Sequence, residues 1–321
     1  MIGKIVIVCT LTVVFLASYS AMPLVRSDTV SDSDTTSNRR VERIGEIEYP
    51  AIGESSGLAA SIHNHELLWT HNDSGSKPRL YAMNYQGEHL AAIHLKGASN
   101  HDWEDMASFR FQGAAYLLIA DIGDNRARRP DCTLYVVREP LLDSVSKVRF
   151  LEIDVAWKIN FSYEDGPRDA EAVAVDPATG QILILSKRNV PPVLYSLPMR
   201  QKSGEPLVAK RLATLSNIPG PAPPDLVQDL FFGRYRNQPT AMDISRDGKK
   251  VLVATYTYAY LFSRKSGQTW LEAFTKPPSR IPLPRRRQGE SVCFTPDGSG
   301  FIIGSEKRPS PLWRIWLTGQ E

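Results

Sequence analysis

The chain has 321 residues, of which 42% are hydrophobic and 23% charged, values typical of a globular protein with enough apolar side chains for a large core. The length allows one large domain or two of ordinary size. The formal net charge at pH 7 is only +3, without the strong basic excess of a nucleic-acid-binding domain, so we expect no nucleic-acid partner.

Residues 1–21 have the pattern of a secretory signal peptide. Lys4 precedes an apolar run over residues 5–17, and small residues follow it. A membrane anchor would need about 20 apolar residues, so we favour cleavage and export, to the periplasm or the medium, over a retained anchor. We therefore expect no stable membrane insertion of the mature chain. Cys9 lies within the apolar run and not at its end, so lipid attachment is not predicted.

Residues 22–40 form a linker rich in Ser, Asp and Thr, too polar to bury a core of its own, and we predict a flexible tether. A single domain is expected over residues 41–321. Two cysteines remain after cleavage, Cys132 and Cys293. They fall in different repeats of the chain, so we expect two free, buried thiols and no disulfide.

Five segments of this domain repeat one pattern. An acidic residue opens a short apolar strand, a turn leads to a second and more apolar strand, and a polar loop leads to a third strand with a central aromatic residue. The turns DPATGQ, SRDGKK and TPDGSG carry the Asp, Gly and Pro of tight hairpins. The opening acids are taken as Glu54, Glu104, Glu171, Asp243 and Glu290.

Repeats of about 45–50 residues with four strands each are typical of β-propeller blades. The predicted fold is therefore all-β, a β-propeller of five four-stranded blades, with a sixth blade within residues 225–239 as the alternative. The last repeat lacks a fourth strand, and residues 42–50 would complete it and close the ring. The expected fourth strands of the other repeats are residues 89–95, 148–159, 208–216 and either 271–276 or 280–284.

In a propeller blade, the start of the first strand and the loop after the second strand lie on the same face. The opening acids should therefore meet these loops at one end of the central channel. The loops are HND at 71–73, DIGDN at 121–125, KRN at 187–189, YTY at 256–258 and EKR at 306–308.

Several carboxylates at one channel mouth would repel one another unless a cation lies between them. Calcium takes about 6–8 oxygen ligands from carboxylates, amides and water, and the scarcity of His and Cys in these loops argues against zinc or copper. The alternative is structural: each acid accepts hydrogen bonds from a neighbouring blade or pairs with an arginine, and DIGDN is a simple turn.

The segment NHDWEDMAS at 100–108 crowds polar groups where a strand begins. His101, Asp102 and Glu104 are candidate acid/base groups or ligands. The alternative is an entry loop in which Trp103 packs between blades. Basic residues on the same face could grip a phosphate or carboxylate, whereas Arg285–Arg287 read better as a solvated rim. The candidate substrate-binding residues are Arg126, Lys187, Arg188, Lys307 and Arg308.

The motifs NDSG, DWEDMA, DIGDN followed by Arg, DAEAVAVD and GES are similar to those of exported bacterial phytase-like propellers of the esterase-like phytase type. The resemblance runs from Glu54 to the C-terminus. It implies hydrolysis of phosphomonoesters by metal-activated water. The calcium ligands that it implies are Glu54, Asp73, Glu104, Asp121, Asp124, Asn125, Glu171 and Glu290.

Two departures from that family concern the fourth repeat, where Met242-Asp243 replaces the usual Glu and the loop carries Tyr256 and Tyr258, and the count of five blades where phytase propellers have six. Two functions follow as hypotheses. The first is a calcium-dependent hydrolase of phosphate or other esters, in which Glu104 or His101 is the base. The second is a non-catalytic propeller that binds a glycan or protein. No nucleophile elbow, Gly-rich phosphate loop or zinc spacing indicates another chemistry, and we expect a monomer.

Overall fold

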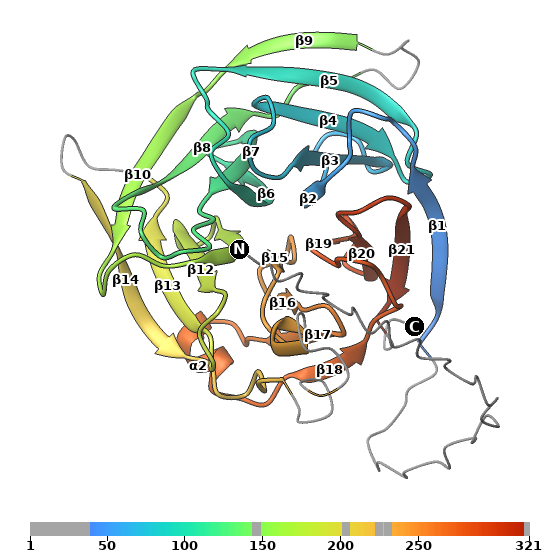
Figure 1. Ribbon diagram of the computed structural model, residues 1–321. Helices are drawn as coiled ribbons and strands as arrows, with labels where there is room; N and C mark the ends of the chain where they lie inside the picture. The colour runs from blue at the N-terminus through green and yellow to red at the C-terminus, as the bar shows by residue number, and fades with distance from the viewer. Residues whose placement is uncertain (1–38, 143–148, 201–205, 222–226, 228–232, 318–321) are drawn as a thin grey trace, which may run out of the picture. The chain divides into compact units, whose positions relative to one another are not determined.

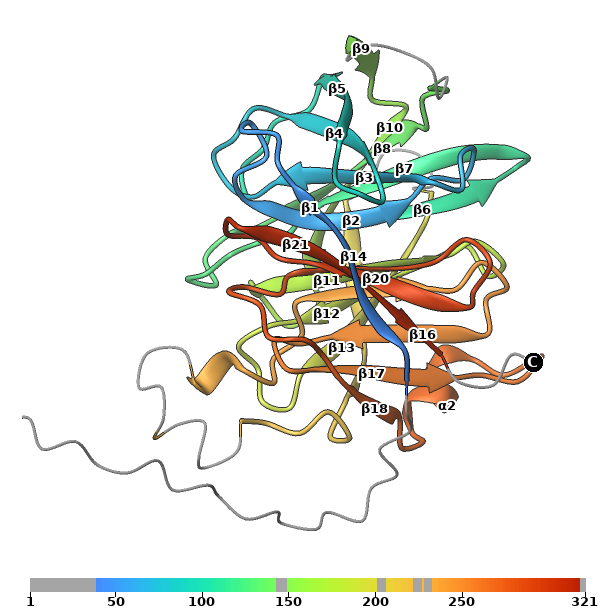
Figure 2. The same ribbon diagram turned by 90° about the vertical axis from the view of Figure 1, so that its right-hand side faces the viewer.

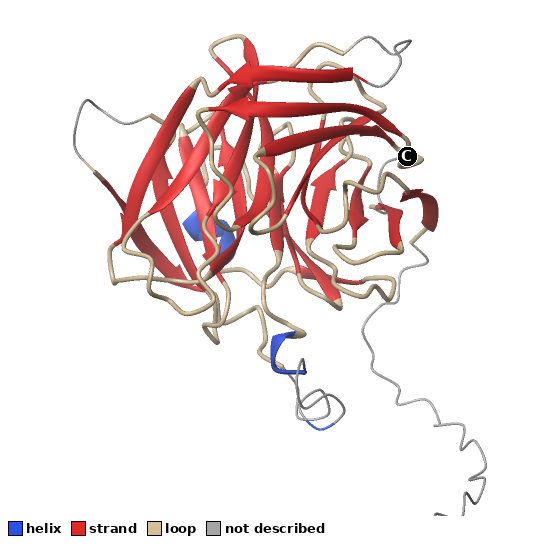
Figure 3. Cartoon of the chain, turned by 45° about the horizontal axis from the view of Figure 1, so that its top comes forward, coloured by secondary structure: helices blue, strands red, loops and turns tan. Residues whose placement is uncertain are grey.

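The computed structural model describes residues 39–142, 149–200, 206–221, 227 and 233–317. The predicted signal peptide and the linker up to residue 38 lie outside this part of the chain. Residues 39–321 form one compact unit, and its regular structure is almost all strand (Figure 3). Within the described residues, no helix is both long and apolar enough to cross a membrane.

The blades radiate from five inner strands that follow one another around a ring, the last of them packing against the first (Figure 1). This closed ring confirms the propeller and its count of five blades. The described part of the 225–239 insertion holds one short 3-10 helix, η1 (Gly233–Tyr235). The inner strands of blades 1 to 5 are β2 (Ser55–Ala60), β6 (Trp103–Phe111), β11 (Ala170–Asp176), β15 (Ala241–Ile244) and β19 (Ser291–Phe294).

Each inner strand pairs with an antiparallel second strand, and each second strand pairs with a third. The second strands are β3 (Leu67–Asn72), β7 (Ala114–Asp121), β12 (Gln181–Ser186), β16 (Lys250–Ala254) and β20 (Gly300–Gly304). The third strands are β4 (Arg79–Asn84), β8 (Cys132–Arg138), β13 (Val193–Pro198), β17 (Tyr258–Ser263) and β21 (Ser310–Trp316).

The N-terminal strand closes the ring, as predicted. β1 (Val41–Ile47) is the outer strand of blade 5 and pairs antiparallel with β21 from Val41↔Ile315 to Ile47↔Ser310. Figure 2 shows β1 running alongside β21 at the rim of the molecule. The outer strands β5 (His89–Lys96) of blade 1 and β14 (Leu207–Thr214) of blade 3 also match the prediction.

The outer strand expected for blade 2 is divided between two blades, which corrects the prediction of one strand over residues 148–159. β9 (Arg149–Asp154) pairs in parallel with β5 on blade 1, whereas β10 (Trp157–Tyr163) pairs with β8 and completes blade 2. The chain turns the corner at Val155 and Ala156, whose N–H groups donate to Lys96 on blade 1 and Val136 on blade 2. The apolar pattern runs on through this corner, so composition alone hides it.

In blade 4 the later of the two candidate segments is the outer strand, β18 (Ser279–Pro282). The LEAF part of the other candidate segment lies in a short helix, α2 (Trp270–Phe274). Thr269 and Glu272 form a capping box at its start, which satisfies the first N–H groups of the helix. The helix buries Trp270, Ala273 and Phe274 against blades 3 and 4.

β10 and β14 also pair with each other, in parallel, so that blades 2 and 3 form one eight-stranded sheet. The hydrophobic core consists of layers between neighbouring blades; one such layer joins blades 2 and 3 and another joins blades 5 and 1. Cys132 lies in the first of these layers and Cys293 in the second. Both are free and buried, which confirms the prediction for these thiols.

Asp105 is a fully buried carboxylate in the ring of inner strands, and it holds three blades together. Its Oδ1 accepts the N–H of Met106 at 2.8 Å, and its Oδ2 accepts those of Val173 at 2.8 Å and Met242 at 3.0 Å. Asp243 joins blade 4 to blade 5 in the same way, because it accepts the N–H of Phe294 at 2.8 Å. The alternative to metal binding was that acidic residues accept hydrogen bonds from neighbouring blades. Asp105 and Asp243 have this structural role.

Candidate metal centre and adjoining cavity

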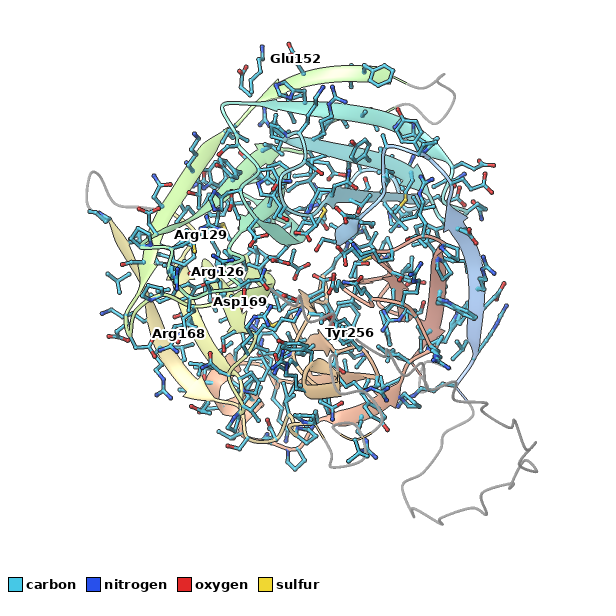
Figure 4. The ribbon with its side chains drawn as sticks, in the orientation of Figure 1. Arg126, Arg129, Glu152, Arg168, Asp169 and Tyr256 are labelled. Atoms are coloured by element: carbon cyan, nitrogen blue, oxygen red, sulfur yellow. The ribbon has the colours of Figure 1, made fainter. Side chains whose placement is uncertain are left out.

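One end of the channel opens into a cavity of about 830 Å³. Its lining includes residues from the starts of inner strands and from the loops that follow second strands, which are the two sets of segments predicted to meet. Asp169 and Tyr256 lie toward the middle of the ring, whereas Glu152 lies at its outer edge (Figure 4). The acidic residues that line the cavity are Asp73, Glu104, Glu171, Glu290 and Glu306.

Hydrogen bonds between blades show which residues share one level of the channel. Ser56 Oγ donates to Glu104 O at 2.6 Å, and the N–H groups of Val173 and Met242 both donate to Asp105 Oδ2. Thr240 stands two residues before Met242, as Glu171 stands two residues before Val173. The sequence alignment of Glu54 and Asp243 with Glu104, Glu171 and Glu290 is therefore wrong: Ser56 and Thr240 hold that position in blades 1 and 4.

Asp73, Asp102 and Glu104 form a group of three carboxylates, with one oxygen from each within 4.8 Å of the others. We call this the three-carboxylate group. No ion pair joins it to a basic side chain in the part of the chain that the structure describes. Gly123 packs against it so closely that a Cβ there would lie 2.2 Å from Glu104 Oε1 and 2.5 Å from Asp102 Oδ2.

This crowding raises the pKa values of all three members. Burial, with the negative charges of Asp73 and Asp169, raises the pKa of Asp102 to about 6. Burial and the charge of Glu171 hold the pKa of Glu104 well above its ordinary value. Burial also raises the pKa of Asp73, against the opposing N–H of Ser74. A cation between these oxygens would relieve both the burial and the repulsion.

A second group consists of Glu104, Asp169 and Glu171, whose oxygens also lie within 4.8 Å of one another. Here basic side chains are already in place, because Lys187 Nζ contacts Glu171 and Arg188 Nε contacts Asp169. The two groups share Glu104. They differ because only the second group has members that pair with a lysine or an arginine of the protein.

Lys187 is buried, with only 5% of the residue exposed. Besides Glu171, its amino group has Tyr256 Oη at 3.4 Å and Glu290 Oε1 at 3.8 Å. Burial lowers the pKa of Lys187, but the negative charge of Glu171 and the other acidic groups outweighs it and holds that pKa well above the ordinary value. The Tyr256 hydroxyl in turn donates to Glu290 at 2.6 Å.

Glu306 adds an unsatisfied acid to the same cavity. The residue is 3% exposed, and its Oε2 is buried without a hydrogen-bond partner. Burial and the charge of Glu290 raise the pKa of Glu306 to about 9. A buried carboxylate oxygen without a partner costs free energy, and it indicates that the cavity is built to receive a donor or a cation.

The remaining lining is basic and aromatic. Arg188 has a left-handed backbone (φ 63°), its N–H donates to Gln238 Oε1 at 2.8 Å, and its guanidinium stacks over Tyr235. Burial lowers the pKa of Arg286 to about 10, and its guanidinium donates to Gly304 O at 3.0 Å. The basic and tyrosine residues of this wall are Arg188, Tyr235, Arg236, Tyr256, Tyr258, Arg285, Arg286 and Arg287.

Two predicted ligands of the DIGDN loop have protein partners. Asp121 accepts the N–H groups of His101 and Asp102 at 3.1 and 3.2 Å and pairs with Arg129 at 2.8 Å. Asp124 accepts the N–H of Arg129 at 2.7 Å, and its own N–H donates to Asp169. The Asp121 carboxylate thus fixes the segment that carries Asp102, and the Asp124 carboxylate closes the turn of its own loop. Metal coordination by both residues stays a prediction.

Other predicted residues lie around the cavity rather than in it. Arg126 and His101 are exposed and do not belong to its lining. Lys307 pairs with Glu54 at 2.7 Å, and Arg308 donates to the backbone carbonyls of residues 48, 49 and 52. Asn125 does line the cavity, where its amide oxygen accepts from Arg188.

Asp169 was missed as a site residue, although a signal for it is present in the sequence. The spacing Asp-x-Glu occurs at the start of two inner strands, as Asp102-x-Glu104 and Asp169-x-Glu171. Both pairs belong to the carboxylate groups. Tyr235 was also missed, because it comes from a loop outside the repeated pattern. Arg285–Arg287 were expected to form a solvated rim, whereas the structure places all three in the cavity lining.

No family model matches the chain, and no curated protein matches it. Among solved structures, the chain is similar to a luciferin-regenerating enzyme, with 10% sequence identity and a TM-score of 0.43; the match covers 88% of this chain and 96% of that chain. At this TM-score the likeness carries no argument about activity, so any assignment rests on the chain's own residues.

Proposed function

We propose that the protein is an exported, calcium-binding propeller that hydrolyses a phosphate ester or another ester at the mouth of its channel. The observation that carries the proposal is the three-carboxylate group: Asp73, Asp102 and Glu104 converge without an internal cation, beside a cavity whose other walls carry arginines. Carboxylate oxygens without His or Cys are the ligands that calcium prefers.

The residues present fit such an ion. Position 123 is a glycine, and a side chain there would collide with the carboxylates of Asp102 and Glu104, so the backbone leaves these carboxylates their space. Glu306 has a carboxylate oxygen without a hydrogen-bond partner in the same cavity. Asp73, Asp102 and Glu104 would hold the ion, and Asp121 would fix Asp102 through its backbone N–H. When bound, calcium would supply a Lewis acid and a more acidic water.

The chain's basic residues would position the substrate. Arg188 lies between the second carboxylate group and the aromatic wall, held by Asp169 and Asn125. Arg285 and Arg287 are exposed in the cavity lining, where they can pair with an anionic group of the ligand. His101 lies outside this lining, so the choice of base between Glu104 and His101 stays a proposal. The motif resemblance to phytase-like propellers and the pattern of residues 1–21 agree with this function.

Thermal melting with calcium and with chelator, combined with turnover of p-nitrophenyl phosphate, tests the proposal. At calcium concentrations of about 100 times Kd, the melting temperature is expected to rise by roughly 5–10 °C, and turnover should require the ion. An unchanged melting temperature would remove the metal from the proposal. Stabilisation without turnover of phosphate or carboxylate esters would instead favour the non-catalytic propeller that binds a glycan or protein.

Calcium stabilisation is expected to increase between about pH 5 and pH 8. In the metal-free protein, the raised pKa values of Asp102, about 6, and of Glu104 mean that the folded state keeps protons that the unfolded chain has lost. The stability contributed by these carboxyls therefore falls as the pH rises from about 4 through their folded-state pKa values. Calcium removes this loss because it binds the deprotonated form.

The measurement is the difference in melting temperature between calcium and chelator at each pH. His71 acts with the opposite sign: burial lowers its pKa from 6.5 to about 4, so its contribution to stability increases with pH over that range. His71 titrates in the same way with calcium and with chelator, so its effect cancels in the difference between the two melting temperatures. A difference that stays constant from pH 5 to 8 would contradict binding at these carboxyls.

A further inference from the structure

The two carboxylate groups at the channel mouth differ in whether basic side chains of the protein contact them. The second group, Glu104, Asp169 and Glu171, has Lys187 and Arg188 in contact with two of its members. The three-carboxylate group has no such partner in the described residues. The two groups share Glu104, so an ion in one would lie close to an ion in the other.

The Lys187 amino group lies where a second ion would be expected. It contacts Glu171 and has Glu290 at 3.8 Å and the Tyr256 hydroxyl at 3.4 Å, so acidic or phenolic oxygens from three blades surround it. The residue is 5% exposed, and its neighbours Glu171 and Glu290 are 5% and 7% exposed. Buried carboxylates of this kind need a positive charge among them.

We propose that the Lys187 ammonium is a resident cation that takes the place of a second divalent ion, so that the mouth of the channel binds one calcium ion and not two. The inference rests on the proposed function, because it takes calcium binding at the three-carboxylate group as given. Lys187 is tethered and buried, so an incoming ion would have to displace it from Glu171 and Glu290 at once.

The acidic residues nearby support the proposal of one calcium ion with Lys187 in place of a second. Glu306 has a buried oxygen without a hydrogen-bond partner in the same cavity, and this ligand atom is not among the contacts of Lys187. Once the ammonium is removed, Glu171 and Glu290 would face each other and Glu104 without a counter-charge. Pairs of divalent ions about 3.5–4 Å apart are held in proteins by bridging carboxylates, and Glu104 is placed to bridge.

Replacement of Lys187 by methionine tests the inference, because Lys187→Met keeps the length of the side chain and removes its charge. Calcium stoichiometry is measured by equilibrium dialysis and calorimetric titration of the full domain. We expect one ion per chain in the unmodified protein and two in Lys187→Met. Lys187→Arg keeps the charge and should stay at one, as should Lys307→Met, which removes a lysine paired with Glu54.

The outcomes separate the two proposals. No calcium bound to the unmodified protein would end the proposed function itself. One ion in both the unmodified protein and Lys187→Met would overturn the resident-cation inference alone, and two ions in the unmodified protein would do the same. If Lys187→Met fails to fold in chelator, recovery of the fold in calcium with two ions bound supports the inference. If it does not fold at all, the unmodified protein crystallised with calcium decides, because an ion bound to Glu171 would overturn the inference.

Discussion

Replacement of Glu104 by glutamine is expected to abolish both the stabilisation by calcium and any calcium-dependent turnover. Glu104 belongs to both carboxylate groups, and its own oxygen lies within 4.8 Å of those of Asp73 and Asp102. Loss of outer-shell partners costs about 10–100-fold in metal affinity, so loss of a direct anionic ligand should cost roughly 100-fold or more.

The same substitution is expected to leave the metal-free protein as stable as before or more stable. Burial and nearby acids hold the pKa of Glu104 well above its ordinary value, so glutamine removes an unfavourable charge when no ion is present. Melting in chelator and in calcium measures both effects on one sample.

Glu54→Gln is the matched control for Glu104→Gln. Glu54 was also predicted to be a ligand, but its carboxylate pairs with Lys307 and does not belong to either carboxylate group. We expect its loss to change calcium affinity by less than about threefold, since an exposed pair contributes about 0–1 kcal/mol. Calcium binding to Glu104→Gln within threefold of the unmodified protein would contradict the site as assigned here.

Replacement of Asp105 by alanine is expected to destabilise the domain by about 3–5 kcal/mol, whether or not calcium is present. Its two oxygens accept three backbone N–H groups from blades 2, 3 and 4, and alanine would remove all three of these hydrogen bonds. For a domain of this size, such a loss corresponds to a fall in melting temperature of roughly 10 °C.

Denaturant unfolding of Asp105→Ala in chelator provides the measurement. Asp131→Ala is the control, because Asp131 is exposed and its removal changes the net charge by the same amount. A free energy of unfolding within about 1 kcal/mol of the unmodified protein would show that the inner strands do not depend on this carboxylate.

The repeat in the sequence was sufficient for the architecture. Five copies of one strand pattern predicted five blades, and the unpaired segment before the first copy predicted the closing strand β1. The division of residues 148–159 was not predictable, because partner strands on two blades decide where that segment bends. The outer strand of blade 4 was left between residues 271–276 and 280–284, and the Thr269–Glu272 capping box is the local signal that places the LEAF segment in a helix.

The site was predicted in outline and not in detail. The loops and strand starts do meet at one end of the channel, but Ser56, whose hydroxyl donates to Glu104 O, holds in blade 1 the position that glutamate holds in blade 2, so Glu54 lies outside that level. Ion pairing across blades, such as Lys187 with Glu290, depends on side-chain packing that no local pattern encodes. Repeated motifs therefore located the mouth, and only the three-dimensional arrangement distinguished the candidate ligands from the acids that hold loops in place.

The uneven joining of the blades at the rim has a consequence for motion. β9 ties the segment between blades 1 and 2 to β5, and β10–β14 pairing joins blades 2 and 3, whereas the described strands of blades 4 and 5 pair only within their own blade. Blades 1 and 2 carry the three-carboxylate group, while Tyr256, Tyr258 and the segment leading from β18 to Arg285–Arg287 belong to blade 4 or its exit. Amide hydrogen exchange should accordingly be faster in the outer strand β18 than in β10 and β14. The side of the cavity that carries the three-carboxylate group would then stay rigid, while the basic, aromatic side from blade 4 moves as a ligand enters.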